Sequence, residues 1–414
     1  MALKDKENRT IVLPIEESIY DTFVGDNKIG HVILSNLIRE SPELFPPDIL
    51  DGYIFYGRTR ISKKLNLRMR RIKIKDTIYR LRPGFVLPYC RAKTGEASAG
   101  LLLLKFGVPF WALAYIFGRN AMWWYRLYLC LGQNSIVGTT IKDPANLPKD
   151  ILADEHHIRR RGNKAYVATV VGANCLLGME VSPKADEVSL QGAYAVFKEE
   201  AQDLWPAYQP DTVNTDGWQA TQNAWKSLFP NIVVIECFLH AFLKVRDRAT
   251  KKIKPYFKEA SGKIWNCYRA CSKRQLAQQI RRLKEWASDK LPESVMRENV
   301  LKLCKKKNRW MQHFDYPQAF RTSNMLDRLM RAMKKHAFNS QMFHAKTISK
   351  TSMNFRAFAL LYNFTPSCPA AWDESKTLKS PAARLNGFVY HDDWLQNLLI
   401  SASLRGFRHR RNPL

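Results

Sequence analysis

The stretch from Pro210 to Lys244 constrains the fold of this chain more than any other segment. The β-branched residues Thr212 to Thr215 predict a short strand that ends at Asp216-Gly217. A polar and aromatic helix is expected from about Gln219 to Leu228, and the continuous apolar run Ile232 to Ile235 predicts a strand buried on both faces. Strand, helix and strand within so few residues predict a right-handed parallel crossover.

Polar residues follow both strands of this crossover. Ligands of parallel sheets bind at the carboxyl ends of the strands, and Asp216 stands at one such end. Cys237 and His240 lie just past the other end. Asp216-Gly217 could alternatively be no more than a turn. A functional site is favoured only if other acids stand at matching points of the fold.

The charge of the chain indicates the kind of partner. Sixty-six Lys and Arg residues against 37 Asp and Glu residues give a formal net charge of +29 over 414 residues. Hydrophobic residues make up 46%, which predicts folded domains with real cores rather than a disordered basic tail. A folded, strongly basic protein favours a polyanionic partner, most simply nucleic acid, over an anionic membrane.

The cysteines and the apolar runs bear on location. Eight scattered cysteines are typical of reduced thiols inside a cell. The beginning MALKDKENRT does not resemble a signal peptide. The most apolar run, Leu101 to Phe117, is interrupted by Lys105, Gly107 and Pro109 and is too short for a membrane span. These features predict a cytoplasmic protein.

Residues 1–98 are predicted to form a basic region with a β-hairpin. Between Arg58 and Arg82 the charged residues are all basic except Asp76, and Arg71 to Lys75 alternate at period two. The alternative is a solvated charged face, but charge of nearly one sign favours phosphate contact. The candidate DNA-binding residues here are Arg70, Arg71, Lys73 and Lys75.

Residues 99–137 are predicted to form a helix-turn-helix. A helix after Leu101 precedes two short helices, Phe110 to Phe117 and Ala121 to Leu131, which the break at Gly118 separates. An ordinary helical hairpin that buries its aromatic residues is the alternative, since Trp123-Trp124-Tyr125 is apolar for a groove-reading helix. In the DNA-binding interpretation the contacts come from Arg119, Asn120 and Arg126.

Residues 148–240 are predicted to form the first part of an α/β core, after a linker from Gly138 to Pro148. A strand begins at Ile151, a hairpin turns at Gly172-Ala173-Asn174, and a helix runs from about Glu187 to Asp203 before the crossover. The expected sheet has three antiparallel strands extended by two parallel strands. This is the ribonuclease H-like arrangement.

A helical insertion is predicted over residues 241–320, and residues 321–414 are expected to close the core. The insertion is basic, with Trp265, Trp286 and Trp310 as apolar anchors. The N-cap cluster Thr322-Ser323-Asn324 predicts a closing helix to about Lys335, and the chain ends in a basic tail, Arg405 to Arg411.

Three acids stand at corresponding points of these elements: Asp154 on the first strand, Asp216 after the fourth and Asp327 in the first turn of the closing helix. Cleavage or joining of a phosphodiester is catalysed by two divalent ions about 4 Å apart, and Mg²⁺ prefers carboxylate oxygens. We therefore predict that these three aspartates are catalytic and bind two Mg²⁺ ions.

The motifs ADEHH, VNTDGW, CFLH and TSNMLDRLMR, in this order, resemble those of DDE-type insertion-sequence transposases of the Mutator-like group. The resemblance covers roughly residues 100–400, and these enzymes carry a C-x2-H motif after the second acid. It implies a ribonuclease H-like catalytic domain that cleaves and transfers DNA strands at terminal inverted repeats and a target DNA. Mg²⁺ would be the cofactor, and Mn²⁺ could replace it.

The resemblance also implies partners and location. A homodimer or higher oligomer would assemble on DNA, in the nucleoid of a bacterial or archaeal cytoplasm, without a membrane or a small-molecule substrate. The family usually has Glu as its third acid, whereas Asp327 is one methylene shorter. Glu298, Glu293 and Asp315 are the alternative third acids.

Four further motif residues have less defined roles. Trp218 could stack on a flipped base or lie in the core. Cys237 and His240 are expected to pack and hydrogen-bond beside the site rather than bind zinc. Asn324 belongs to the cap of the closing helix.

Two other functions stay open. The first is a ribonuclease H-like nuclease or resolvase without strand transfer. The second is a non-catalytic DNA-binding protein derived from a transposase. The complete set of acids favours an enzyme, and the large basic insertion favours a transposase over a simple nuclease.

Overall fold

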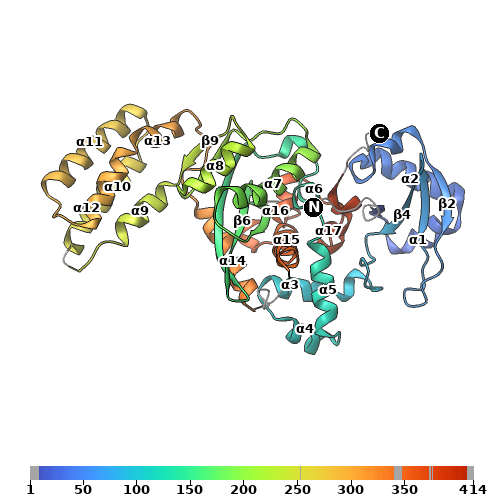
Figure 1. The fold of residues 1–414 in the computed structure, drawn as a ribbon. Helices are drawn as coiled ribbons and strands as arrows, with labels where there is room; N and C mark the ends of the chain where they lie inside the picture. The colour runs from blue at the N-terminus through green and yellow to red at the C-terminus, as the bar shows by residue number, and fades with distance from the viewer. Residues whose placement is uncertain (1–8, 252, 340–346, 373, 375, 408–414) are drawn as a thin grey trace.

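The structure of the chain is a computed structural model that describes residues 9–251, 253–339, 347–372, 374 and 376–407 (Figure 1). It has an α/β fold with two mixed sheets, one of four strands and one of five. A helical arm extends from the five-stranded sheet on the side away from the four-stranded sheet (Figure 1). Residues 408–411 of the predicted basic tail lie outside the described residues.

The N-terminal unit is built on the four-stranded sheet, in the order β1-β4-β3-β2. Its elements are β1 (Thr10–Leu13), α1 (Glu17–Gly25), α2 (Asn27–Glu40), β2 (Ile54–Arg58), β3 (Arg70–Ile74) and β4 (Thr77–Pro83). The predicted basic hairpin is confirmed, because β3 and β4 pair antiparallel around the turn at Lys75 and Asp76. β1 adds to β4 in parallel.

The other end of the chain completes this unit. α17 (Trp394–Ser401) and the 3-10 helix η9 (Ser403–Gly406) bring Ile400 and Leu404 into the apolar core around β1. The Ser403 hydroxyl accepts a hydrogen bond from the Val12 amide at 3.0 Å and donates one to the Leu44 carbonyl at 2.6 Å. Residues 1–98 are therefore not packed independently of the C-terminal segment.

Three helices follow the N-terminal unit, as predicted: α3 (Ser98–Lys105), α4 (Phe110–Phe117) and α5 (Ala121–Leu131). Gly118 ends α4 in the left-handed conformation with φ +70°, and the Asn120 side chain accepts from the Trp123 amide at 2.7 Å to begin α5. α5 buries Trp124 and Tyr128 in the central core.

The predicted linker between residues 138 and 148 is wrong in its first half. α6 (Ile136–Thr140) is fully buried, and Ile141 is buried after it. Glycine is needed at position 138 because a β-carbon there would lie 2.0 Å from the carbonyl oxygen of Gly406. The glycine therefore marks a close packing contact with η9 rather than a flexible connection.

The five-stranded sheet confirms the predicted arrangement of three antiparallel and two parallel strands. Its strands are β5 (Asp150–Arg160), β6 (Asn163–Gly172), β7 (Cys175–Ser182), β8 (Thr212–Thr215) and β9 (Val233–Glu236), in the order β7-β6-β5-β8-β9. β5, β6 and β7 are antiparallel neighbours, whereas β8 pairs parallel to β5 and β9 parallel to β8. α7 (Glu187–Leu204) precedes β8, and α8 (Gln219–Leu228) joins β8 to β9.

The two faces of this sheet pack on different helices. Ile151 and Ala153 face α7 and α8, whose Tyr194 and Trp225 fill that core. Leu152 faces the opposite core, which includes α14 (Asn324–Asn339) and α15 (Ile348–Phe364). Alternation along β5 therefore assigns Asp154 to the side of α14 and Glu155 to the side of α7 and α8.

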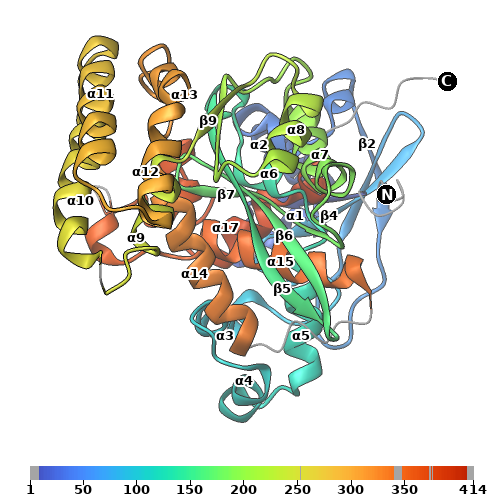
Figure 2. The same cartoon turned by 60° about the vertical axis from the view of Figure 1, so that its left-hand side comes forward.

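The insertion forms a separate helical arm (Figure 2). It contains α9 (Phe238–Arg246), α10 (Lys254–Tyr268), α11 (Lys273–Asp289), α12 (Val295–Lys305) and α13 (Lys307–Met311). Its own apolar core includes the three predicted tryptophans, with Trp286 and Trp310 buried and Trp265 half-buried. The arm is thus a domain of its own rather than a long loop.

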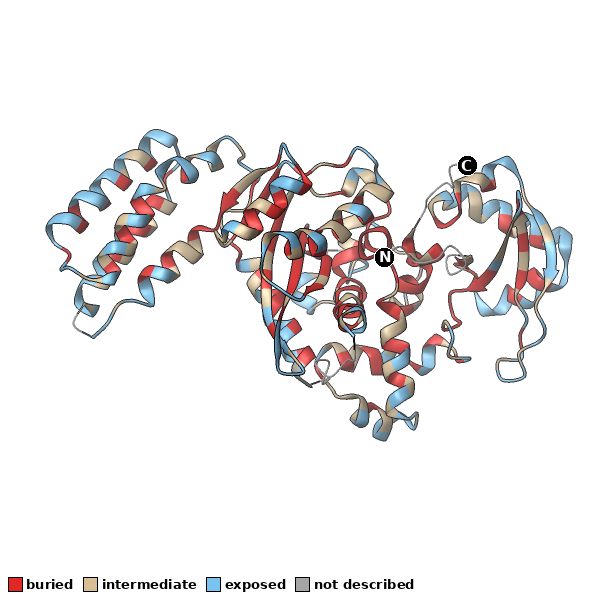
Figure 3. Ribbon diagram, viewed as in Figure 1, coloured by how far each residue is buried: buried red, intermediate tan, exposed pale blue. Residues whose placement is uncertain are grey.

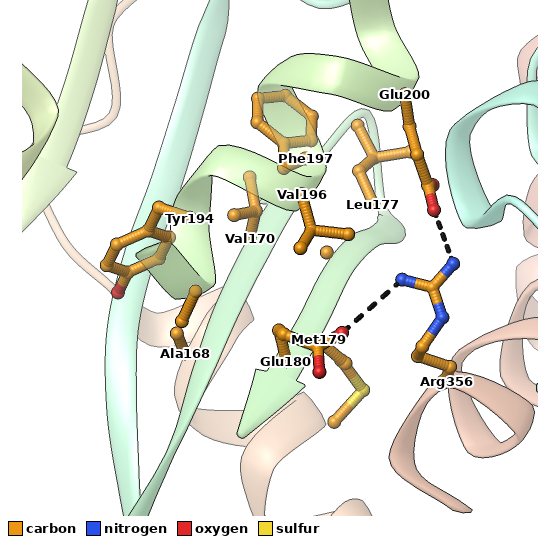
Figure 4. Close-up of a pocket in the computed structure, with 12 residues that line it drawn as sticks. Ala168, Val170, Leu177, Met179, Glu180, Tyr194, Val196, Phe197, Glu200 and Arg356 are labelled. Carbon is orange, nitrogen blue, oxygen red and sulfur yellow. Dashed lines mark hydrogen bonds and ion pairs between the residues drawn. The ribbon is translucent and has the colours of Figure 1, made fainter. Parts of the chain in front are cut away.

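α15 is the central helix of the molecule and is buried along most of its length (Figure 3). Its Arg356 is ion-paired with Glu200 of α7 and lies 3.6 Å from Glu180 of β7 (Figure 4). The same guanidinium donates to the carbonyls of Gly132 and Asn134. α16 (Pro381–Asn386) completes the helices. Within the described part of the chain, no helix combines the length and the apolar character needed to cross a membrane.

Candidate metal centre

β5 and β8 hold Asp154 and Asp216 side by side. Leu152 and Asn214 are partners in the parallel register. Asp154 is two residues further along β5, and Asp216 is two residues beyond Asn214, directly after the end of β8. Neighbouring strands lie about 4.8 Å apart, and residues two apart point to the same face. Asp216 also forms a turn, since its carboxylate accepts from the Trp218 amide at 2.8 Å. Asp216-Gly217 is thus a turn, and the turn leaves the Asp216 carboxylate near enough to Asp154 to raise its pKa.

α14 brings the third aspartate to the same place. Leu326 and Met330 pack α14 into the central core, and Asp327 lies in its first turn. Asp154, Asp327 and His240 each offer one ligand atom, and these three atoms lie within 4.8 Å of one another. All three side chains are half-buried. The sequence predicted two of these three residues as metal ligands and placed His240 beside them.

The backbone holds the start of α14 against the end of the sheet. The Phe238 amide donates to the Arg321 carbonyl at 3.0 Å, and the Asn214 side chain donates to the Phe320 carbonyl at 2.7 Å. The chain therefore returns from the insertion directly to the ends of β8 and β9. This docking is what brings Asp327 to Asp154.

The charges around Asp154 are strongly coupled. Burial, and then the Asp216 carboxylate, raise the pKa of Asp154 to about 7, while the Glu155 amide and His240 act in the opposite direction. Two carboxylates in a half-buried site disfavour each other's ionisation, and a divalent cation between them would favour it. The donor set therefore fits a metal: Asp154, Asp216, Asp327 and His240 are the residues that could hold one.

Cys237 and His240 are joined by hydrogen bonds, as the sequence analysis expects. The hydrogen bond with Cys237 raises the pKa of His240 to about 9, although burial opposes it, and Asp154 and Asp327 add to the rise. Burial alone would raise the pKa of the Cys237 thiol, but the hydrogen bonds with His240 and Ser323 lower it overall.

Ser323 connects this pair to Asp327. Its amide donates to the Cys237 sulfur at 3.3 Å, and its hydroxyl lies 3.4 Å from His240 Nδ1. The same hydroxyl is 3.1 Å from the Asp327 carboxylate, and the Asp327 amide donates to the Ser323 carbonyl at 2.8 Å. Ser323 directly precedes α14, whose first residue, Asn324, is exposed.

Sequence reasoning missed two buried acids beside the site. Glu155 lies on the opposite face of β5, where Tyr194 and Thr221 each donate to its carboxylate at 2.7 Å. Glu236 ends β9 and is ion-paired with the helical arm. Both signals were in the sequence, because Glu155 directly follows Asp154 and Glu236 ends the last strand. Glu155 is even part of the ADEHH motif, but only its aspartate was assigned a role.

Trp218 was predicted either to stack on a flipped base or to lie in the core, and its burial is intermediate between the two. It is half-buried at the start of α8, with the rings of His157 and Tyr166 centred 6.4 and 6.1 Å from its own. His157 on β5 is exposed and Tyr166 on β6 is half-buried, so the three rings form a partly exposed aromatic cluster. Trp218 is therefore not part of the closed core.

The prediction that Arg70 binds DNA is wrong, because its side chain is buried. It shares the inward face of β3 with Ile72 and Ile74 and is 1% exposed. Its guanidinium donates to the carbonyls of Val24 and Asp26 at the end of α1, and it lies 3.9 Å from the Phe55 ring centre. Arg70 is a structural cap of α1.

The neighbouring basic residues stay on the surface but are partly paired. Arg71 and Lys73 are half-buried on the outward face of β3. Lys73 lies 3.6 Å from Asp76, and Lys75 contacts both Asp48 and Asp51 at 2.9 Å. Lys75 is therefore held by acids of its own unit.

The three candidate DNA-binding residues of the predicted helix-turn-helix differ in how far they are engaged by other residues. Arg119 is ion-paired with Glu96 and lies over the Trp123 ring, and Asn120 is occupied as the cap of α5. Arg126 is exposed on α5. The helices agree with the sequence, whereas two of the three side chains already have structural partners.

A scan against protein-family models gives no match for this chain, and a search of curated proteins gives none either. The class of protein therefore rests on the fold and on the acid site.

Proposed function

We propose that this chain is a DDE-type transposase that binds the ends of a mobile DNA element and catalyses metal-dependent strand cleavage and strand transfer. The observation that carries the proposal is that Asp327 of α14 lies within ligand distance of Asp154 on β5, while the Asp216 carboxylate, directly after β8, interacts with Asp154 through its charge. In this proposal the five-stranded sheet is a ribonuclease H-like core. Its order β7-β6-β5-β8-β9 and strand directions support that interpretation.

In the proposed reaction the residues of the chain position the carboxylates that would hold the metal ions. Bound Mg²⁺ or Mn²⁺ would neutralise the scissile phosphate and activate a water or a 3′-hydroxyl. The paired strands β5 and β8 position Asp154 and Asp216, and the Ser323 hydrogen bond orients Asp327. Glu155, on the other face of β5, hydrogen-bonds to α7 and α8 and stiffens the strand beneath the site.

Exposed basic residues on two elements suit DNA. The β5–β6 turn exposes Arg159, Arg161 and Lys164 at the end of the strand that carries Asp154. The outer face of α11 in the arm exposes Arg274, Arg282 and Lys284. Basic residues on two separate elements favour binding of a long polyanion over a small substrate. The helical arm supports a transposase over a simple nuclease, which needs no such platform.

The proposal is tested with full-length protein, Mg²⁺ and labelled DNA containing the ends of the element that flank the gene. Asp154→Asn and Asp216→Asn should each abolish cleavage and leave DNA affinity unchanged or higher, since they remove negative charge near phosphate. Asp211→Asn is the matched control, because Asp211 is exposed just before β8. Cleavage above a few per cent of wild type in either site variant would reject the assignment.

The same gel separates the alternatives. Joined products indicate a transposase, and cleavage without joining indicates a nuclease or resolvase. Specific binding to the element ends without cleavage in Mg²⁺ or Mn²⁺ indicates a non-catalytic DNA-binding protein.

A further inference from the structure

We propose that His240 is a direct ligand of the metal centre, together with Asp154 and Asp327, and that this three-residue site prefers Mn²⁺ to Mg²⁺. The inference rests on the proposed metal-dependent function but concerns which atoms bind the cation. It assigns a metal-binding role to the histidine of the C-x2-H motif, which is predicted from the sequence to pack and hydrogen-bond beside the site.

The geometry of the three side chains carries the inference. They come from β5, α9 and α14, and one donor atom of each lies within 4.8 Å of the other two. A cation about 2.1 Å from each donor keeps two donors no more than about 4.2 Å apart. Small side-chain rotations would therefore close the site around one ion.

The environment of His240 leaves one ring nitrogen for a metal. Nδ1 lies 3.4 Å from the Ser323 hydroxyl, and the imidazole is also hydrogen-bonded to Cys237. Metal-binding histidines characteristically have their second nitrogen held in this way, which fixes the ring orientation. Nε2 is then the atom directed to the cation, and Cys237 and Ser323 are positioning residues.

The donor set decides the preferred ion. Mg²⁺ prefers oxygen ligands and keeps much of its water, whereas an imidazole nitrogen strengthens binding of first-row transition ions. Asp216 lies outside the group of three and couples to Asp154 through charge. The centre therefore has two unequal halves, an all-oxygen half with Asp154 and Asp216 and a half that contains nitrogen.

A competing arrangement uses the same residues without a His–metal bond. A protonated His240 would then pair with Asp154 and Asp327, and cations would bind only to carboxylates. The two arrangements differ in one measurable property, which is a nitrogen nucleus bound to the metal.

Pulsed electron paramagnetic resonance of full-length protein loaded with Mn²⁺ alone measures this property. We expect ¹⁴N modulation from one directly bound imidazole, and its loss when the protein is labelled with [¹⁵N]histidine. Bound Mn²⁺ without ¹⁴N modulation in the unlabelled wild type would overturn the inference. This result needs no variant, so it does not depend on how a substitution folds.

Variants then assign the nitrogen to a residue. His240→Gln should lose the ¹⁴N modulation and weaken Mn²⁺ binding, measured by titration calorimetry, by about tenfold or more, with a smaller effect on Mg²⁺. His157→Gln is the matched control, because His157 is an exposed histidine on β5 close to the site. Modulation that persists in His240→Gln, or disappears in His157→Gln, would contradict the assignment.

The outcome is separable from that of the proposed function. Cleavage that depends on Asp216 without a metal-bound nitrogen would leave the transposase proposal standing and reject His240 as a ligand. A metal-bound His240 in a protein that cleaves no DNA would do the reverse.

Discussion

The carboxylate of Glu236, the last residue of β9, lies 3.0 Å from the Arg309 guanidinium of α13 and is also paired with Lys306. The Glu236 side chain is 3% exposed, whereas those of Lys306 and Arg309 are 34% and 50% exposed. The ion pairs therefore anchor the helical arm to the carboxyl edge of the sheet. Asp216 follows β8, the neighbouring strand, so the anchor lies beside the candidate metal centre.

Glu236→Gln should loosen the arm. The substitution removes a buried anion, but its two partners are partly solvated, so the free energy of unfolding should fall by only about 1–2 kcal/mol. Urea denaturation measures this change, and limited proteolysis between the arm and the sheet should become faster. Glu298→Gln is the control, because Glu298 pairs with Lys302 on the exposed surface of α12. An equal effect of both substitutions would contradict the anchoring role.

Gly217→Ala should damage the site itself. Gly217 has φ +92°, and a β-carbon there would lie 2.7 Å from the Glu236 carboxylate. Both the backbone strain and the displaced Glu236 would disturb the turn at Asp216, so cleavage should fall at least tenfold while stability drops by about 1–3 kcal/mol. Gly192→Ala on the exposed side of α7 meets nothing within 4 Å and should stabilise the protein by about 0.5–1 kcal/mol. A fully active Gly217→Ala variant would show that the turn tolerates the change.

Arg70 and Arg71 should behave oppositely. Arg70→Leu removes the buried cap of α1 and should cost about 2–4 kcal/mol of unfolding free energy. Arg71→Ala together with Lys73→Ala should leave the fold intact and weaken binding to all DNA sequences, lowering the salt slope by about one per residue. Thermal denaturation and binding titrations at several salt concentrations measure the two effects. Unchanged salt dependence in the double variant would place the phosphate contacts elsewhere.

Sequence patterns predicted the parts of the fold that local periodicity determines. The apolar run of β9 and the β-branched residues of β8 indicated a buried parallel pair, and the turn at Ala173-Asn174 adopts the positive φ values expected of a tight hairpin. The alternation along β3 also indicated that Arg70 is buried, but its charge suggested a surface position. Arg70 has the same parity as Ile72 and Ile74, and therefore shares their buried face.

Long-range docking explains what the sequence did not predict. His240 and Asp327 are separated by the whole helical arm, and they meet because Phe238 binds the Arg321 carbonyl. No spacing rule describes such a contact. Gly138 was misinterpreted for a similar reason, since its packing partner Gly406 lies at the other end of the chain.

His336 should make stability depend on pH. It is buried in α14, where Nδ1 contacts the Leu104 carbonyl at 2.6 Å and the other ring nitrogen lies 2.9 Å from the Tyr128 hydroxyl. Burial lowers the pKa of His336 from 6.5 to about 4. Between these values the unfolded state binds a proton that the folded state does not, so stability present above pH 6.5 is lost as the pH falls, by about 3 kcal/mol at pH 4.

The difference between wild type and His336→Gln isolates this group from other titrating residues. Denaturation at several pH values should show a steeper loss below pH 6.5 in wild type than in the variant. Parallel curves over that range would mean that the pKa of His336 is the same in the folded and unfolded states, and would contradict the prediction.

Asp327 gives the sharpest test of the third acid. If it binds metal, Asp327→Ala should be as inactive as Asp216→Asn, whereas Asp327→Glu should keep measurable cleavage, because a rotamer change on α14 can absorb one methylene. The alternative acids belong to the arm and already have partners. Glu293 pairs with Arg297, Glu298 with Lys302 and Asp315 with Lys273, all on exposed surfaces.

Alanine at Glu293, Glu298 or Asp315 should therefore leave cleavage intact. If Asp327 only favours the start of α14, its removal would cost about 0.3–1 kcal/mol and spare the activity. Cleavage assays and melting curves of the same four alanine variants separate the two roles. An active Asp327→Ala enzyme rejects the assignment, and an inactive Glu298→Ala enzyme moves the third ligand into the arm. Loss of both activity and Mn²⁺ affinity in Asp327→Ala alone is the expected result, because only this acid lies within ligand distance of Asp154 and His240 among the four.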